Sequence, residues 1–322
     1  MLTALHTGSM VNPIKRYPQA KLSDFTTFKL GGPCRLLIEC TTPQELIDTV
    51  YDLNQSKTTF ILIGGGSNLV VSDLGLDCTV IRYISPSVII NRHDNQLTVG
   101  AGTLLDDLAL WCVNEGLEGI NFASGIPGTV GGAVVGNAGA WGKQVGDIFI
   151  SAQIIDKQGN LKTVDTAYMC FAYRHTHLKE TEDIIVSVTF NLTNGDPITL
   201  AQERAQILKM RQEKHPDLNT HPCAGSFFRN IEPTSKADRR QAAGWFLEQA
   251  GGKNLSSGGA FIFDKHANII VKGPSGTAQD VYDLQHKMID LVKTKFGFTL
   301  NREVRFVGPF NAASGVNPEG FW

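Results

Sequence analysis

Apolar residues recur along the chain at both helical and strand-like spacing, in short segments. A threonine, a proline and a glutamate within 42–45 make a capping-box start for a helix. The apolar face of this helix would consist of Leu46, Val50 and Leu53. Because β-rich runs follow at 58–63 and 78–83, this region predicts a small α+β unit.

The middle of the chain predicts a second unit, built from strands, a hairpin and a helix. The expected elements are strands at 87–91, 96–101, 148–155, 161–165 and 184–191, and a capped helix at 103–115. A charged amphipathic segment at 199–214 predicts a helix that leads to the last part of the chain.

The last part of the chain predicts a third unit. A helix is expected near 236–250, ended by two glycines, and it is followed by a hairpin within 260–272. Thr277 and Asp280 form a capping-box start for a further helix. We expect the glycine-, proline- and asparagine-rich tail at 309–322 to be a surface segment.

Composition narrows the class of protein. The 322 residues are 42% hydrophobic and 19% charged, which suits packed cores in two or three domains. The formal net charge of -2 implies no basic stripe, so a nucleic-acid partner is disfavoured. No run approaches the ~18–20 apolar residues that a membrane helix needs. Segment 1–18 lacks the apolar region of a secretory signal.

The six cysteines are scattered without a CxxC pair, and the eight histidines offer no matching metal-ligand spacing. We therefore expect reduced thiols, a cytoplasmic protein and no bound metal.

Two glycine-rich loops are the first candidates for chemistry. The loop at 64–68 follows a β-rich run, and the loop at 125–132 leads to a further glycine cluster at 136–140. Unhindered backbone amides in succession bind phosphate oxygens without a lysine. Either loop alone is as readily an ordinary turn, but two such loops, both tied to strands, favour a nucleotide.

Two common nucleotide motifs are excluded. Leu69 stands where the dinucleotide fingerprint after Gly64 requires its third glycine, and Leu105 does so after Gly100. Gln144 follows Gly142-Lys143, so a Walker A motif is absent.

Spacing alone does not favour a functional role for the candidate polar residues. It favours a surface arginine after a strand for Arg174, and a turn serine that caps a backbone amide for Ser226. It also favours a turn residue for His266, while Glu303 is as readily the partner of a neighbouring arginine. Ser226 lies outside a GxSxG pattern, which disfavours an acyl-transfer nucleophile.

Eight segments in order resemble the UDP-N-acetylenolpyruvoylglucosamine reductase family of flavoenzymes, over about residues 21–308. The segments are FTTFKLGG (25–32), FILIGGGSNLVVSD (60–73), VGAGTLLDDLALWC (99–112), GIPGTVGGAVVGNAGAWG (125–142), FAYRHT (171–176), CAGSFFRN (223–230), KHANIIV (265–271) and LNREVRFVG (300–308). The short interval between Arg174 and Ser226 is similar to the shorter, second type of this family.

The resemblance implies noncovalent FAD between two α+β subdomains of the vanillyl-alcohol-oxidase/p-cresol-methylhydroxylase type, plus a C-terminal α+β substrate domain. The implied boundaries are 20–85 with 304–322, then 86–215, then 216–303. It also implies NADPH-dependent reduction of UDP-N-acetylglucosamine enolpyruvate for peptidoglycan synthesis.

The resemblance also implies roles for individual residues. Arg174 and Glu303 would stabilise an enolate, and Ser226 would donate a proton. Tyr173, Arg229 and Asn230 would bind substrate. The implied FAD-binding residues are Gly64, Gly65, Gly66, Ser67, Asn68, Gly125, Ile126, Pro127, Gly128, Thr129, Gly131, Gly132, Asn137, Ala138 and Gly139.

Two departures from the family pattern bear on the substrate. Phe261 stands where a polar glutamine is common, and Cys223 replaces an asparagine. We expect a cytoplasmic monomer that acts on a small UDP-sugar, without nucleic acid or membrane. The alternatives are an FAD-dependent oxidoreductase with a different acceptor and a noncatalytic nucleotide-binding protein.

Overall fold

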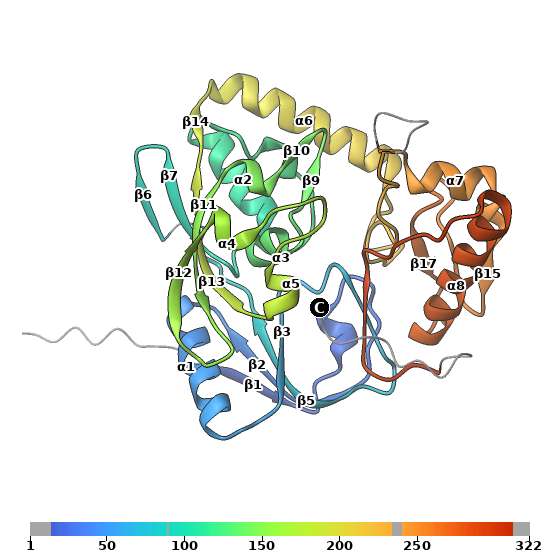
Figure 1. Ribbon diagram of the computed structural model, residues 1–322, viewed down its shortest axis with the longest axis horizontal. Coiled ribbons are helices and arrows are strands. Elements are labelled where there is room, and N and C mark those ends of the chain that lie inside the picture. The colour runs from blue at the N-terminus through green and yellow to red at the C-terminus, as the bar shows by residue number, and fades with distance from the viewer. Residues whose placement is uncertain (1–13, 89, 234–239, 312–322) are drawn as a thin grey trace, which may run out of the picture.

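The computed structural model describes residues 14–88, 90–233 and 240–311, and it consists of two sheets with a smaller α+β part beside them (Figure 1). The first sheet has the order β1-β2-β5-β3, in which β2, β5 and β3 run parallel and β1 is antiparallel to β2. These strands are Lys15–Pro18 (β1), Cys34–Cys40 (β2), Phe60–Ile63 (β3) and Leu76–Tyr83 (β5).

Helix α1, Pro43–Gln55, packs against this sheet and begins as predicted. The Thr42 side chain accepts a hydrogen bond from the Glu45 amide, while the Glu45 side chain accepts one from the Thr42 amide. Its apolar face is buried, so the helical period of this segment was interpreted correctly.

The second sheet is antiparallel throughout and has the order β12-β11-β13-β7-β6. Its strands are Asn91–His93 (β6), Gln96–Gly100 (β7), Phe149–Ile155 (β11), Leu161–Asp165 (β12) and Ile184–Asn191 (β13). Its helices are Leu105–Asn114 (α2), Val130–Val135 (α3), Thr166–Met169 (α4) and Leu178–Thr181 (α5). Shorter elements complete this unit: Leu117–Glu118 (β8), Gly139–Ala140 (β9), Lys143–Gln144 (β10), Thr193–Asn194 (β14), and single 3-10 turns at Asn121–Ala123 and Val145–Asp147.

The strand predicted at 87–91 is wrong. Ser85 accepts a hydrogen bond through its hydroxyl oxygen from the Ser87 amide, and the intervening Pro86 has no amide hydrogen to give to a sheet. The chain therefore turns there. The Ile90 amide donates to the Thr98 carbonyl at 2.9 Å, and strand β6 begins at Asn91.

One continuous hydrophobic core joins the two sheets. It includes Ile38 and Ile81 from the first sheet and Leu97, Val99 and Val188 from the second, all 1% exposed or less. Loops at the boundary of the sheets are thereby held by both, which is the property a ligand site there requires.

Helix α6, Pro197–Lys214, runs from the second sheet to the C-terminal part (Figure 1). That part contains Ala243–Gln249 (α7), Ala278–Phe296 (α8), a 3-10 turn at Gly252–Asn254, and the small sheet Ser256–Ser257 (β15), Ala260–Ile262 (β16) and Ile270–Lys272 (β17). Its core is shared with Phe28, Val70 and Phe306 from the rest of the molecule.

The helix predicted near 236–250 is too long. Its first four residues lie outside the described chain, and α7 begins only at Ala243. Gln241 both donates to and accepts from the backbone of Ile231, at 3.0 and 2.9 Å, so its peptide groups serve a bridge rather than a helix.

After α8 the chain returns to the first sheet's side of the molecule. Strand β18, Arg305–Val307, pairs in parallel with β4, Leu69–Val71, which follows the first glycine loop. A further 3-10 turn, Leu22–Phe25, lies near the start. Within the described residues, no helix has the length and apolar character needed to cross a membrane.

The capping box of α1 gives a test of the fold. Thr42→Ala should lower the free energy of unfolding by about 1 kcal/mol, because the Glu45 amide loses its acceptor. Urea denaturation followed by circular dichroism measures this. Thr42→Ser keeps the oxygen and should stay close to the wild type; a similar loss in both variants would contradict the capping role.

Candidate active site

The two glycine loops lie against each other although far apart in the sequence. The Ser67 hydroxyl donates to the Pro127 carbonyl at 3.0 Å. A Cβ added to Gly65 would stand 3.1 Å from the Gly128 Cα. The loops therefore form one surface at the boundary of the two sheets.

This surface has the features that phosphate groups require. Gly66 and Gly128 have φ of +61° and +118°, values that L side chains rarely adopt. The amides of Gly65, Gly66 and Ser67 donate to no other residue in the described part of the chain. Free backbone donors in succession suit a pyrophosphate, so the residues fit FAD.

An aspartate on helix α2 fixes the glycine loop at 125–132 to the helices beside it. Asp106 on α2 accepts a hydrogen bond from the Gly125 amide at 2.7 Å and forms an ion pair with Arg204 on α6, also at 2.7 Å. The loop is thus fixed to two helices.

A cavity of about 990 Å³ brings the three predicted catalytic residues together. Arg174, Ser226 and Glu303 all line it, and so do residues of the second loop and of the glycine cluster after it. Those predicted FAD residues are Gly125, Ile126, Pro127, Ala138 and Gly139. We call this the main cavity.

Other predicted FAD residues lie along a separate cavity of about 460 Å³. Gly64, Thr129, Gly131 and Gly132 line it, between the two sheets. Residues of the second loop thus line both cavities, and Gly64 of the first loop lines the smaller one.

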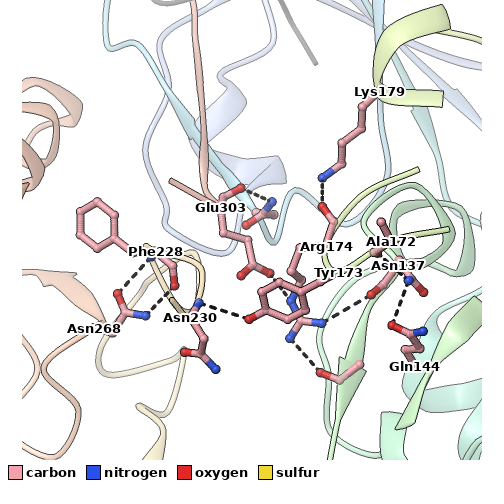
Figure 2. Close-up of polar contacts among 12 residues, drawn as sticks. Asn137, Gln144, Ala172, Tyr173, Arg174, Lys179, Phe228, Asn230, Asn268 and Glu303 are labelled. Atoms are coloured by element: carbon pink, nitrogen blue, oxygen red, sulfur yellow. Dashed lines mark hydrogen bonds and ion pairs between the residues drawn. The ribbon is translucent and has the colours of Figure 1, made fainter. Parts of the chain in front are cut away.

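Arg174 is fixed by backbone contacts on a tight turn. Ala172 and His175 exchange two backbone hydrogen bonds, and Arg174 between them has φ +55°. Its guanidinium donates to the Gly139 carbonyl at 2.8 Å and to the Asn137 carbonyl at 3.4 Å (Figure 2). Arg174 therefore points inward, and the interpretation as a surface arginine is not supported.

Asn137, predicted to bind FAD, has its side chain occupied by protein groups. Its amide nitrogen donates to the Ala172 carbonyl at 2.8 Å and to Gln144, and its oxygen accepts from Gly146. These contacts hold the turn that carries Arg174.

Glu303 forms an ion pair with Arg174, at 2.9 Å between Oε1 and Nε, with 25% and 22% of the side chains exposed. Its amide donates to the Phe227 carbonyl, and its carbonyl accepts from the Asn68 side chain at 3.0 Å. Three separate chain segments meet at this residue.

Ser226 lies on the extended segment next to Glu303. Gly225 before it has φ +77°, and Phe227 after it donates to the Asn268 carbonyl. The Ser226 hydroxyl makes no hydrogen bond to another described residue, so the structure gives no support to a turn-capping role.

Of the three predicted substrate residues, two lie on the main cavity. The Tyr173 hydroxyl oxygen accepts from the Asn230 amide at 3.2 Å, and both residues line the cavity. Arg229 is not among the lining residues, but its charge acts on Glu303 and Lys179.

The Glu303 carboxyl is held between opposing influences. Burial raises its pKa above the usual carboxylate value, while the charges of Arg174, Lys179 and Arg229 act to lower it. The net effect is a raised pKa, with burial the largest cause.

His266 lines the main cavity but serves a turn. Its Nδ1 accepts from the Asn268 amide at 3.2 Å, and burial lowers its pKa, which favours the neutral ring. The interpretation as a turn residue agrees with these contacts.

Two residues of the site were not anticipated. Lys179 donates to the Arg174 carbonyl at 2.7 Å, and the side chain of Asn268 bonds both backbone groups of Phe228. The partner of Asn268 lies 40 residues away and is brought close by the fold, whereas Lys179 lies only five residues after Arg174.

Two sheets that meet at amide-rich loops, beside a cavity lined by an arginine, a serine and a glutamate, define an FAD-dependent oxidoreductase. Residues 34–165 match the family described as FAD binding domain, and residues 216–307 match UDP-N-acetylenolpyruvoylglucosamine reductase, C-terminal domain. The chain belongs to the UDP-N-acetylenolpyruvoylglucosamine reductase family. The predicted fold class and FAD cofactor are thereby confirmed.

The similarity extends over most of the chain. UDP-N-acetylenolpyruvoylglucosamine reductase of Clostridium beijerinckii is 33% identical over 90% of this chain and 92% of its own length. The protein of that name from Anoxybacillus flavithermus is 37% identical over 89% and 93%. The crystal structure of the Thermus caldophilus enzyme superposes with a TM-score of 0.74 at 28% identity, covering 92% of this chain and 99% of that one.

The contact between the glycine loops gives a test. Gly128→Ala should weaken FAD binding by about tenfold or more, because a Cβ there would stand 2.6 Å from the Ser67 hydroxyl on a backbone of φ +118°. Fluorescence titration of the flavin-free protein with FAD measures this.

Gly142→Ala is the matched control. Gly142 also has positive φ, at +80°, but a Cβ there meets nothing within 4 Å. Equal weakening in both variants would mean that backbone strain, not loop contact, determines binding.

Proposed function

We propose that this chain reduces the enolpyruvyl double bond of UDP-N-acetylglucosamine enolpyruvate to UDP-N-acetylmuramate, a step in peptidoglycan synthesis, with NADPH as the electron source. The observation that carries the proposal is the convergence of Arg174, Ser226 and Glu303 on one cavity beside the FAD loops. The relatives' names give the substrate.

We propose that the amides at 64–68 and 125–132 hold the FAD pyrophosphate. FAD, when bound, would take a hydride from NADPH and supply it to the methylene carbon of the double bond. The protein's own residues must then manage the charge and the proton that this addition leaves behind.

Arg174 would bind the substrate carboxylate and the negative charge that spreads onto it as the double bond is reduced. A guanidinium suits this task because its planar donors match both carboxylate oxygens and it remains charged at every working pH. Its contacts to two carbonyls fix its orientation before substrate arrives, so little reorganisation is required.

Ser226 would donate its hydroxyl proton to the carbon next to the carboxylate. A hydroxyl is a weak acid, so it protonates only a strongly basic, carbanion-like centre, and an enolate-like intermediate provides one. The absence of a hydrogen-bond partner for this hydroxyl among the described residues leaves it available to substrate.

Glu303 would orient Arg174 and share hydrogen bonds with the enolate, through its carboxyl or a water. A second carboxylate on Arg174 would raise the Glu303 pKa further, because like charges disfavour ionisation. Glu303 would then hold a proton and donate a hydrogen bond where negative charge develops.

Tyr173 and Asn230, already joined by a hydrogen bond, would contact the sugar or phosphates of the substrate. Phe261, which stands where the family commonly has a glutamine, is 39% exposed and does not line the main cavity. This difference from the family pattern is therefore compatible with binding of the proposed substrate. Cys223 does line it, with a buried thiol.

We propose a division of labour along the chain. Residues 20–85 with 304–322 and residues 86–215 would bind FAD, and residues 216–303 would bind substrate; 312–322 lie outside the described residues. The pairing of β18 with β4 supports assigning the segment after 303 to the first subdomain.

We propose that the enzyme works in the cytoplasm as a monomer, without nucleic acid or membrane. All six cysteines are free, which suits a reducing compartment. The loops and all three catalytic candidates come from a single chain, so no second copy is required to complete the site.

Ser226→Ala tests the proton donor. Reduction of bound FAD by NADPH should remain near the wild-type rate, while reoxidation by the enolpyruvyl nucleotide should slow by about 10²–10⁴-fold. Stopped-flow absorbance of the flavin separates the two half-reactions. Ser257→Ala, in the same domain, should change neither. Equal slowing of both half-reactions by Ser226→Ala would refute the role.

Arg174→Lys tests the bidentate contact. Lysine keeps the charge but loses the planar fork, so the KM for the enolpyruvyl nucleotide should rise by about tenfold or more. Reduction of FAD by NADPH should be unaffected. A wild type that oxidises NADPH with oxygen alone, and gains nothing from this nucleotide, would instead favour a different acceptor.

A further inference from the structure

Four cationic side chains act on the charges around Glu303. Arg174, Lys179 and Arg229 act on the Glu303 carboxyl, and Arg305 acts on Lys179. They come from the turn at 172–175, helix α5, the segment after Ser226 and strand β18. The proposed function uses only Arg174 and Glu303 of this group for chemistry.

Lys179 contacts the catalytic arginine through its backbone. Its Nζ donates to the Arg174 carbonyl at 2.7 Å, closing a loop between α5 and the turn before it (Figure 2). Arg174 has φ +55°, a conformation that costs free energy for a residue with a side chain. A hydrogen bond to that peptide group therefore helps to hold the turn in the form that aims the guanidinium at the main cavity.

The surroundings of Lys179 are unfavourable for a charged amine. Burial and the charges of Arg229, Arg305 and Arg174 lower the pKa of Lys179 to about 8. The negative charge of Glu303 acts in the opposite direction. Glu180 on the same helix instead pairs with His175 and His177. These surroundings disfavour the charged form of Lys179, so we infer that its role lies in its contacts with neighbouring groups, such as the Arg174 carbonyl.

We propose that Lys179 is a positioning residue of the reductase site, resting on the function proposed above. It fixes the Arg174 turn through the carbonyl and adds a positive charge that acts on the Glu303 carboxyl. The same charge adds to the field that stabilises the enolate.

Two observable consequences follow from its charge. Below a pH of about 8 the ammonium is present; above it, the site loses one positive charge, so activity should fall as pH rises through this value. Removing the ammonium altogether should raise the pKa of Glu303, since one of the charges that lowers it is gone.

The experiment compares Lys179→Gln and Lys179→Arg in the FAD-loaded protein. Lys287→Gln is the matched control, because Lys287 also donates to a backbone carbonyl, that of Ser256, away from the site. The first readout is kcat/KM for the enolpyruvyl nucleotide against pH. The second is the infrared carboxyl band of Glu303 without substrate, identified by its loss in Glu303→Gln.

In Lys179→Gln the Glu303 band should titrate at higher pH than in the wild type, and kcat/KM should fall. Lys179→Arg should leave the band unchanged and retain activity above pH 8, where the wild type declines, because a guanidinium stays charged. Lys287→Gln should match the wild type in both readouts.

The proposal is overturned if Lys179→Gln leaves the Glu303 titration unchanged, or if Lys179→Arg retains the wild-type decline near pH 8. A uniform loss of activity at every pH without a shifted band would indicate packing alone and would also overturn it. A wild type inactive on the nucleotide would refute the proposed function, yet the infrared titration would still decide the role of Lys179. Should Lys179→Gln fail to fold, the comparison of Lys179→Arg with the wild type decides it.

Discussion

A carboxylate withdrawn from water must be paired, and the site of this protein depends on that requirement. Only 25% of the Glu303 side chain is exposed, so its negative charge is stabilised by cations held close to it. Arg174 supplies the direct partner at 2.9 Å, and Lys179 and Arg229 add charge around it. Because the partners come from distant segments, the whole chain must fold before the pair can exist. Pairing also acts against the rise in the Glu303 pKa that burial causes.

The backbone conformation of three turns also fixes where the groups of the site point. Arg174, Gly225 and Gly128 all have positive φ, each on a turn that the two sheets or the C-terminal part hold in place. A positive φ costs free energy for Arg174, which carries a side chain, whereas glycine adopts it readily. The reductase site therefore consists of tight turns on rigid supports. This arrangement suits a reaction in which charge develops at a fixed position, because donors oriented in advance need not reorganise.

Local chemistry determined the elements that were predicted well. The capping boxes of α1 and α8 and the apolar run of β13 act within a few residues, so their start and period can be seen in the sequence. One error had a local cause, because Pro86 and the Ser85 hydroxyl make a turn where a strand was predicted. Other features depend on partners farther along the chain. The backbone bridge between Ile231 and Gln241 delays α7, and the pairing of β18 with β4 joins ends of the chain that no periodicity connects. Extended segments take their partners from the whole fold, so their register is a tertiary property.

The sequence by itself determined which chemical groups are present: two turns of unhindered amides, one arginine, one serine and one glutamate, in an order similar to a flavoenzyme family. It could not say whether Arg174 faces solvent or Glu303 pairs with a neighbour, since every such residue is compatible with a surface role. Only the tertiary structure decided this, by pressing loop 64–68 against loop 125–132 and bringing Glu303 next to Arg174. It also added Lys179, whose influence depends on burial and on charges from other segments. Burial of a charged group and the distance to its partners are properties of the folded chain. They give Arg174, Lys179 and Glu303 the environment of a functional site.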